Sequence, residues 1–170
     1  MTKYGRRMWA ATVVAIVGVA ALALVGPPVG AQGKGKELVA TSTEGAAKKQ
    51  HRLVLQVNTD DPAMMNLALN NATNVEQYYK DAGEKVEIEI VTFGPGLHML
   101  RDDTSPVKAR LKTIAEKSTS ITFDACGNTQ ENMGKAENKK IPLVAQATVV
   151  KSGVVRVMEL QEQGWTYVRP

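Results

Sequence analysis

The feature that most constrains the fold of this chain is an alternation of short apolar runs with segments of helical pattern. The apolar runs have the length of β-strands and lie at residues 53–57, 86–93, 121–126, 145–150 and 165–168. Apolar residues recur at helical spacing at residues 62–82, 106–117 and 152–163, and residues 129–133 can form one more helical turn. Because strands that are joined by helices form parallel sheets, the sequence predicts an α/β domain with a parallel sheet covered on both faces.

The first 50 residues do not have the composition of a folded core. Lys3, Arg6 and Arg7 form a basic start, an apolar run follows at residues 8–25, and small residues at 29–31 end the segment. This pattern is typical of a secretory signal peptide, residues 1–31, and the alternative is a membrane anchor that is not removed. Residues 32–50 are polar and predict a flexible linker, which leaves residues 51–170 as the domain. We therefore expect a periplasmic or secreted protein that contacts a membrane only if the signal is retained.

Charge and cysteine content narrow the classes of function. Three of the 21 basic residues lie in the signal segment, and the remaining 18 compare with 17 acidic residues, so the domain is close to neutral. A nearly neutral domain that is poor in aromatic residues is not expected to bind nucleic acid. One cysteine cannot form an internal disulfide, and one cysteine with two histidines is a poor ligand set for zinc. We expect neither a metal nor a cofactor.

The single cysteine, Cys126, is the leading candidate for chemistry. It ends the third apolar run, and ligands and catalytic groups gather at the carboxyl ends of the strands in open α/β sheets. If residues 129–133 form a helical turn, its free N–H groups would lower the pKa of the thiol. The charge of the neighbouring Asp124 would raise that pKa. The alternative is a buried cysteine that packs as a small apolar side chain.

The residues that follow Cys126 belong to the same candidate site. Gly127 allows a close approach of the backbone, while Asn128 and Thr129 either hydrogen-bond the sulfur or shape the turn. Asn71 is a separate candidate, because it lies on the predicted apolar stripe of the first long helix. A buried asparagine needs hydrogen-bond partners, which would be either adjacent backbone loops or a ligand. The stripe itself is expected to comprise Met64, Leu67, Ala68, Ala72, Val75, Tyr79 and Ala82.

The turn after the second apolar run supplies the remaining candidates. Gly94 and Gly96 flank a proline and allow the backbone to come close to whatever occupies the edge of the sheet. His98 follows them and would lie at the same edge as Cys126. A histidine beside the thiol could act as a base or stabilise the thiolate, and the alternative is a histidine that packs in a loop.

Four segments, taken together, resemble the DsrE/DsrF-like (YchN-like) family. They are Leu69-Asn70-Asn71 with Asn74, residues 91–97 (VTFGPGL), residues 125–129 (ACGNT) and residues 159–170 (ELQEQGWTYVRP). The resemblance covers residues 51–170 and implies a three-layer α/β/α domain with a five-stranded parallel sheet. It also implies a homo-oligomer, either a trimer or a hexamer.

The resemblance further implies sulfur relay, in which a cysteine accepts sulfane sulfur as a persulfide and passes it on. Cys126 is the residue that can carry this role, with a sulfur donor and a sulfur acceptor as partners. The alternative is a non-catalytic, oligomeric binding module of the same fold, in which Cys126 is structural.

Overall fold

The structure, a computed structural model, describes residues 50–170, so the predicted signal peptide and nearly all of the linker lie outside the described residues. The elements are β1 (Gln50–Val57), α1 (Pro62–Asp81), β2 (Lys85–Thr92), the 3-10 helix η1 (Gly94–Leu100), α2 (Lys108–Lys117), β3 (Ile121–Cys126), α3 (Gly127–Glu137), β4 (Ala147–Val150), α4 (Gly153–Glu162) and β5 (Thr166–Val168). Each predicted strand forms, at the predicted place in the chain.

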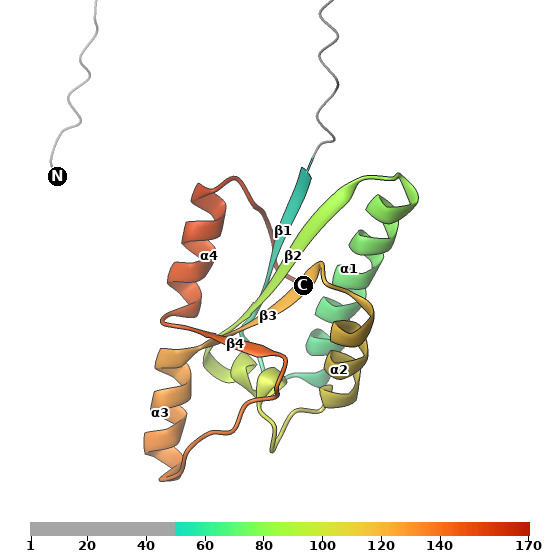
Figure 1. The fold of residues 1–170 in the computed structure, drawn as a ribbon. Helices are drawn as coiled ribbons and strands as arrows, with labels where there is room; N and C mark the ends of the chain where they lie inside the picture. The colour runs from blue at the N-terminus through green and yellow to red at the C-terminus, as the bar shows by residue number, and fades with distance from the viewer. Residues whose placement is uncertain (1–49) are drawn as a thin grey trace, which may run out of the picture. The chain divides into compact units, whose positions relative to one another are not determined.

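All five strands run parallel in one sheet, in the order β4-β3-β2-β1-β5. The chain builds the sheet outward from β1 to β4, and it then crosses back so that β5 pairs with the other side of β1. Figure 1 shows α4 on one side of the sheet and α1 and α2 on the other. This is a three-layer α/β/α fold with a five-stranded parallel sheet, which confirms the predicted fold class.

The two faces of the sheet bury different side chains, because successive residues of a strand point to opposite sides. Leu53 and Leu55 of β1 belong to the larger core, which includes buried side chains of α1, η1 and α2. Val54, between them, packs with Val157 and Leu160 of α4 in a smaller core. The face under α4 therefore has less apolar cover than the opposite face.

The ends of α1 follow from local sequence. Asp61 precedes the helix, and its Oδ1 accepts a hydrogen bond of 2.8 Å from the N–H of Ala63. Pro62 occupies the first helical position, where its missing N–H is not needed. Gly83, just after the helix, has a φ of +69°, which glycine adopts without strain. The predicted helix of residues 62–82, with its acidic cap and its glycine stop, is therefore confirmed.

The predicted apolar stripe of α1 is confirmed in part: Ala68 and Ala72 are buried and Val75 and Tyr79 pack against the core, but the stripe is rotated slightly toward Met65 and Leu69. Met65, Ala68, Leu69 and Ala72 are the buried residues, whereas Leu67 is 41% exposed. The predicted and the observed stripes both have helical spacing, and they are centred about one residue apart. Only packing against the sheet decides between two such stripes, since the sequence supports both.

Two further helices differ from the predictions. The single turn expected at residues 129–133 is an 11-residue helix, α3, that begins directly after Cys126 and ends at Asn138. None of its residues is buried, so hydrophobic periodicity gave little sign of its length. In α4, Val157 and Leu160 face the sheet, whereas Val154 and Met158, apolar residues within the helical pattern predicted for residues 152–163, are exposed.

Candidate functional site

Cys126 lies at the carboxyl edge of the sheet, where two helices begin. It is the last residue of β3 and also the residue that precedes α3. The neighbouring strand β4 ends at Val150 and leads into α4, whose first residue is Gly153. A Cβ atom added to Gly153 would lie 3.2 Å from Cys126 Cβ, so the start of α4 also packs against the cysteine. Cys126 as a residue is 4% exposed.

Donor groups of Asn128, Thr129 and Gly153 surround the sulfur of Cys126 and affect the pKa of its thiol. Burial raises the pKa of the thiol, but hydrogen bonds from the Thr129 hydroxyl and from the N–H groups of Gly153, Thr129 and Asn128 lower it. The hydrogen bonds outweigh burial, and the pKa lies below its ordinary value of 9.0. Two of the donor residues open α3 and one opens α4, and helix N-termini carry positive partial charge. The arrangement therefore favours a thiolate.

Thr129 ties the site to the turn after β2. Its Oγ1 accepts a hydrogen bond of 3.0 Å from the N–H of Gly94, so its own hydrogen can point to the sulfur. Gly94 has a φ of +53°, a conformation that favours glycine. The sequence named Gly94, Thr129 and Cys126 as candidates, and the structure joins the three through these hydrogen bonds.

The residues beside Cys126 pack tightly against the loop between β4 and α4. The N–H of Asn128 also lies 3.2 Å from the carbonyl oxygen of Lys151, while its exposed side chain is at the surface. A Cβ atom on Gly127 would lie 3.2 Å from the Val150 carbonyl oxygen, which explains the need for a small residue. Both Gly127 and Asn128 therefore shape the junction, and Asn128 also bonds the sulfur through its backbone.

An open hollow of about 600 Å³ borders this junction. It is lined by Asn128, Val150, Lys151, Ser152, Val155, Arg156 and Glu159. Cys126 is not among the lining residues, although Asn128 and Ser152 lie next to the donors that surround its sulfur. The hollow opens beside the start of α4.

The sequence predicts a negative charge on Asp124 that raises the pKa of the Cys126 thiol, and the surroundings of Asp124 decide how much of this charge is present. Asp124 lies on the face under α4, where its carboxyl shares a hydrogen bond with Glu89 and lies 3.4 Å from Arg156 Nε. Burial, together with the hydrogen bond and charge of Glu89, raises the pKa of Asp124 to about 8, against the opposing effect of Arg156. At neutral pH Asp124 is therefore largely protonated, and it carries no charge that would oppose a thiolate.

His98 contacts Thr104, and Gly96 packs against β1. The ring Nδ1 of His98 is 2.8 Å from the Thr104 hydroxyl, and no hydrogen bond or ion pair joins this histidine to Cys126 within residues 50–170. Gly96 is buried, and a Cβ atom there would lie 2.1 Å from the carbonyl oxygen of Val57. The backbone of β1, rather than a ligand, thus occupies the space that Gly96 leaves open.

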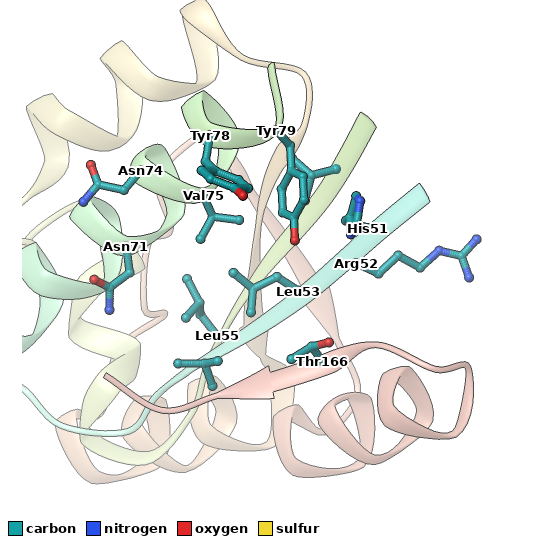
Figure 2. Close-up of a pocket in the computed structure, with 12 residues that line it drawn as sticks. His51, Arg52, Leu53, Leu55, Asn71, Asn74, Val75, Tyr78, Tyr79 and Thr166 are labelled. Atoms are coloured by element: carbon teal, nitrogen blue, oxygen red, sulfur yellow. The ribbon is translucent and has the colours of Figure 1, made fainter. Parts of the chain in front are cut away.

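Asn71 lies away from the cysteine, in an apolar groove between α1 and the β1–β5 edge of the sheet (Figure 2). The groove has a volume of about 480 Å³ and is lined by His51, Arg52, Leu53, Leu55, Asn71, Asn74, Val75, Tyr78, Tyr79, Val86, Thr166 and Val168. Asn71 is half-buried, and among the described residues no side-chain hydrogen bond ties it to a backbone loop. His51 and Tyr79 stack at one end, with ring centroids 3.8 Å apart.

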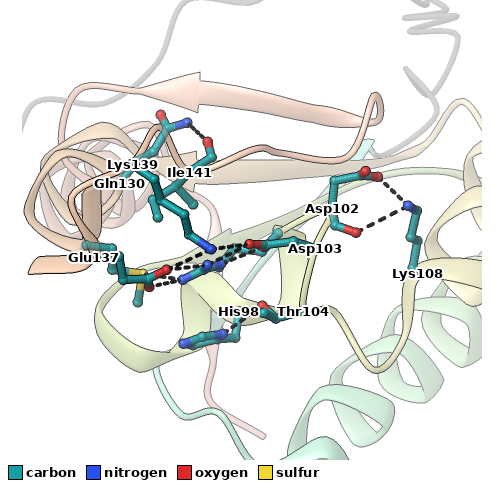
Figure 3. A network of polar contacts seen from close by, with 11 residues as sticks. His98, Asp102, Asp103, Thr104, Lys108, Gln130, Glu137, Lys139 and Ile141 are labelled. Atoms are coloured by element: carbon teal, nitrogen blue, oxygen red, sulfur yellow. Dashed lines mark hydrogen bonds and ion pairs between the residues drawn. The ribbon is translucent and has the colours of Figure 1, made fainter. Parts of the chain in front are cut away.

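A charged network that no sequence pattern indicated holds the far end of α3 (Figure 3). Arg101, which is 1% exposed, binds both oxygens of Asp103 at 2.9 Å and both oxygens of Glu137 at 2.5 and 2.8 Å. Lys139 also contacts both carboxylates, at 3.0 and 3.1 Å. The network fixes α3 against the segment after η1, and so it helps to hold the N-terminus of α3 at Cys126.

No family model matches the chain, and no curated protein matches it. Among solved structures, the chain is similar to a protein of unknown function, MTH1491, from Methanobacterium thermoautotrophicum. The two are 29% identical in sequence, and their superposition has a TM-score of 0.60. The match covers 71% of this chain and 99% of the other, so it extends over nearly the whole of that protein. The similarity supports the α/β/α fold.

Residues 50–170 contain neither a metal-binding cluster nor a membrane-spanning helix. No three side chains of the types His, Cys, Asp and Glu lie close enough together to hold a metal ion in this part of the chain. No helix in the same residues has the length and apolar character that crossing a membrane requires.

Proposed function

We propose that the chain is an exported protein of the DsrE/DsrF-like type in which Cys126 carries sulfur. The observation that supports this proposal is the position of Cys126 where two helices begin, with donor groups of Thr129, Asn128 and Gly153 that lower the pKa of its thiol. A cysteine that served only as a small apolar side chain would not need such donors. A thiolate held in this way is the form that attacks sulfur, because the thiol itself is a poor nucleophile.

The proposed step is a transfer of sulfane sulfur. The Cys126 thiolate attacks the outer sulfur of a donor persulfide, the new S–S bond forms as the donor S–S bond breaks, and the donor leaves as a thiolate. The product on Cys126 is a persulfide, and a thiolate on an acceptor repeats the step in the other direction. The donors around the sulfur would stabilise the negative charge of both the thiolate and the persulfide.

Export and assembly belong to the same proposal. The basic and apolar start of the chain supports a signal peptide, and the domain would then act in the periplasm or outside the cell. We also propose a homo-oligomer, a trimer or hexamer, on the basis of the family resemblance. The donor and acceptor of sulfur would be partners that share the exported location.

The direct test is sulfur loading followed by intact mass. The exported protein is purified without reductant, treated with glutathione persulfide, and measured before and after addition of a thiol reductant. We expect the wild type to gain the mass of one or more sulfur atoms, which the reductant removes, and Cys126→Ser to gain none. Equal loading of the serine variant would contradict the proposal. The same measurement gives the first residue of the mature chain.

A binding module is the second candidate function, and the groove at Asn71 favours it. The side-chain amides of Asn71 and Asn74 make no hydrogen bond within the described residues and so are available to a ligand, and the floor of the groove is apolar. The burial of Cys126 is also consistent with a structural cysteine. A folded wild type that takes up no sulfur and resists alkylation would favour this function over sulfur transfer.

A further inference from the structure

A buried charged cluster lies on the sheet face that carries Cys126. Arg156 of α4 binds Glu89 of β2 through two hydrogen bonds, of 2.6 Å from Nε and 2.8 Å from Nη2. Arg156 Nε also lies 3.4 Å from Asp124 of β3, and the two carboxyl groups are hydrogen-bonded to each other. Glu89 and Asp124 are each only 5% exposed. Two carboxyl groups therefore share one guanidinium beneath α4.

The cluster is connected to Cys126 in two ways. Asp124 precedes Cys126 by two residues on β3, so both side chains point to the same face, about 7 Å apart along the strand. Arg156 lies in the first turn of α4, three residues after Gly153, which packs against Cys126 and lowers the pKa of its thiol through its N–H. The ion pair thus holds the turn that supplies one of the donor groups.

The charge of the cluster depends on a single proton. With one proton on the carboxyl pair, the two carboxyl groups and Arg156 sum to zero, and loss of that proton leaves one negative charge. The other charged groups near the pair are Glu159, 4.0 Å from Arg156 Nη1, and Lys151 on the loop before α4. Glu87, two residues before Glu89 on the same face of β2, is half-exposed and pairs with Arg52 at 3.4 Å. The paired positions on the neighbouring strands, Val54 on β1 and Thr148 on β4, carry no charge.

We propose that the Glu89–Asp124–Arg156 cluster positions and tunes Cys126. Arg156 clamps the start of α4 onto the sheet, and the shared proton keeps the face beside the sulfur uncharged while the thiolate forms. Burial and the neighbouring Glu89 raise the pKa of Asp124 to about 8, so the proton is present at neutral pH. This inference deepens the proposed function, because it concerns the same cysteine, but it is tested on the thiolate itself and not on sulfur transfer.

The consequence is a coupled titration. A thiolate at Cys126 opposes loss of the cluster proton, and an ionised cluster opposes formation of the thiolate. At about 7 Å and an effective dielectric constant of about 30 to 40, the pKa of the group that ionises second is raised by about one pH unit. A cluster that served only to hold the fold together would change stability and leave the thiol titration where it was.

The experiment uses two titrations of the folded full-length protein. Ultraviolet absorbance of the thiolate reports Cys126 alone, because it is the only cysteine, with Cys126→Ser as the blank. Carbon NMR of labelled aspartate reports the Asp124 carboxyl, assigned with Asp124→Asn. Thiol curves are compared between the wild type and Asp124→Asn, and Asp124 curves are compared between the wild type and Cys126→Ser. Glu87→Gln, which removes an exposed charge from the same face of β2, is the matched control.

We expect one of the two curves to lie about one pH unit higher in the wild type than in the variant that lacks the other group. Arg156→Met should raise the pKa of the Cys126 thiol. Arg156→Lys should show a smaller increase, since lysine keeps the charge but cannot form the bidentate hydrogen bonds of arginine. Glu87→Gln should move neither curve. If neither curve moves in Asp124→Asn and Cys126→Ser, the inference is overturned, even if Arg156→Met fails to fold.

Failure of this inference is distinguishable from failure of the proposed function. Coupled titrations in a protein that takes up no sulfur would leave the inference standing and remove the sulfur-carrier function. Sulfur uptake without coupled titrations would leave the sulfur-carrier function standing and overturn the inference about the cluster.

Discussion

Replacing Thr129 with valine tests the hydrogen bonds that favour a thiolate at Cys126. Valine keeps the shape of threonine but lacks the hydroxyl, so the sulfur loses one donor and the Gly94 N–H loses an acceptor 3.0 Å away. A hydrogen bond to a charged group contributes about 1.5–3 kcal/mol. At pH values below the midpoint of the thiol titration, the thiolate population should therefore fall by about tenfold or more. The pKa of the thiol rises, because burial then acts against fewer donors.

The same substitution should change stability in a defined direction. The folded-state pKa of Cys126 is below 9.0, so the folded protein releases this proton before the unfolded chain does. Stability therefore rises with pH between the folded-state pKa and about 9, and Thr129→Val should reduce that rise. At lower pH the variant should be less stable by about 1–3 kcal/mol, because a partly buried N–H is left without its acceptor.

Thiolate absorbance against pH, with urea unfolding at several pH values, measures both effects. Thr129→Ser is the matched control, since it keeps the hydroxyl and should titrate close to the wild type. A valine variant with the thiol curve of the wild type would refute the reasoning, because it would mean that the Thr129 hydroxyl does not stabilise the thiolate.

The remaining predictions concern the scaffold around the site. Gly96→Ala should cost about 3 kcal/mol or more in urea unfolding, because its Cβ would lie 2.1 Å from a β1 carbonyl oxygen. Gly83→Ala, with empty space and a φ of +69°, should cost about 1–2 kcal/mol, and equal losses would contradict the packing argument. Arg101 holds the pKa of two carboxyl groups below the usual range, so its network stabilises the fold above about pH 4 and loses this effect as pH falls. Arg101→Met should therefore be less stable at pH 7 and less sensitive to acid, and an unchanged acid dependence of unfolding would argue against the network. Asp61→Ala should lower thermal stability by about 1 kcal/mol, whereas Asp61→Asn, which can still cap α1, should lose little; equal losses would exclude the cap.

The sequence located the candidate site but not its composition. Cys126 was predicted at the end of a strand, and its place at the carboxyl edge of the sheet agrees with that. The donor from Gly153 was missed, because that residue follows Cys126 by 27 positions and reaches it only when β4 pairs beside β3. A glycine shortly after a strand is the one signal of such close packing, and many turns share it.

Charged side chains were the hardest to place from sequence. The sequence predicts a negative charge on Asp124 beside the thiol, but burial and Glu89, from another strand, favour the neutral form of Asp124 against the opposing effect of Arg156. Arg101 and Glu137 are 36 residues apart and meet only when α3 folds back beside the segment after η1. No local pattern indicates such pairs, since ion pairs between distant elements leave no periodicity in the sequence.

The sequence by itself determined the elements and the class of fold. Local rules were sufficient for this, because strand length, helical spacing, the Asp61 cap and the Gly83 stop all act over a few residues. The tertiary structure decided which face of α1 is buried, which edge of β1 receives β5, and which groups surround the Cys126 sulfur. These features depend on contacts between residues that are far apart in the chain, and only packing in three dimensions selects among the arrangements that the local pattern allows.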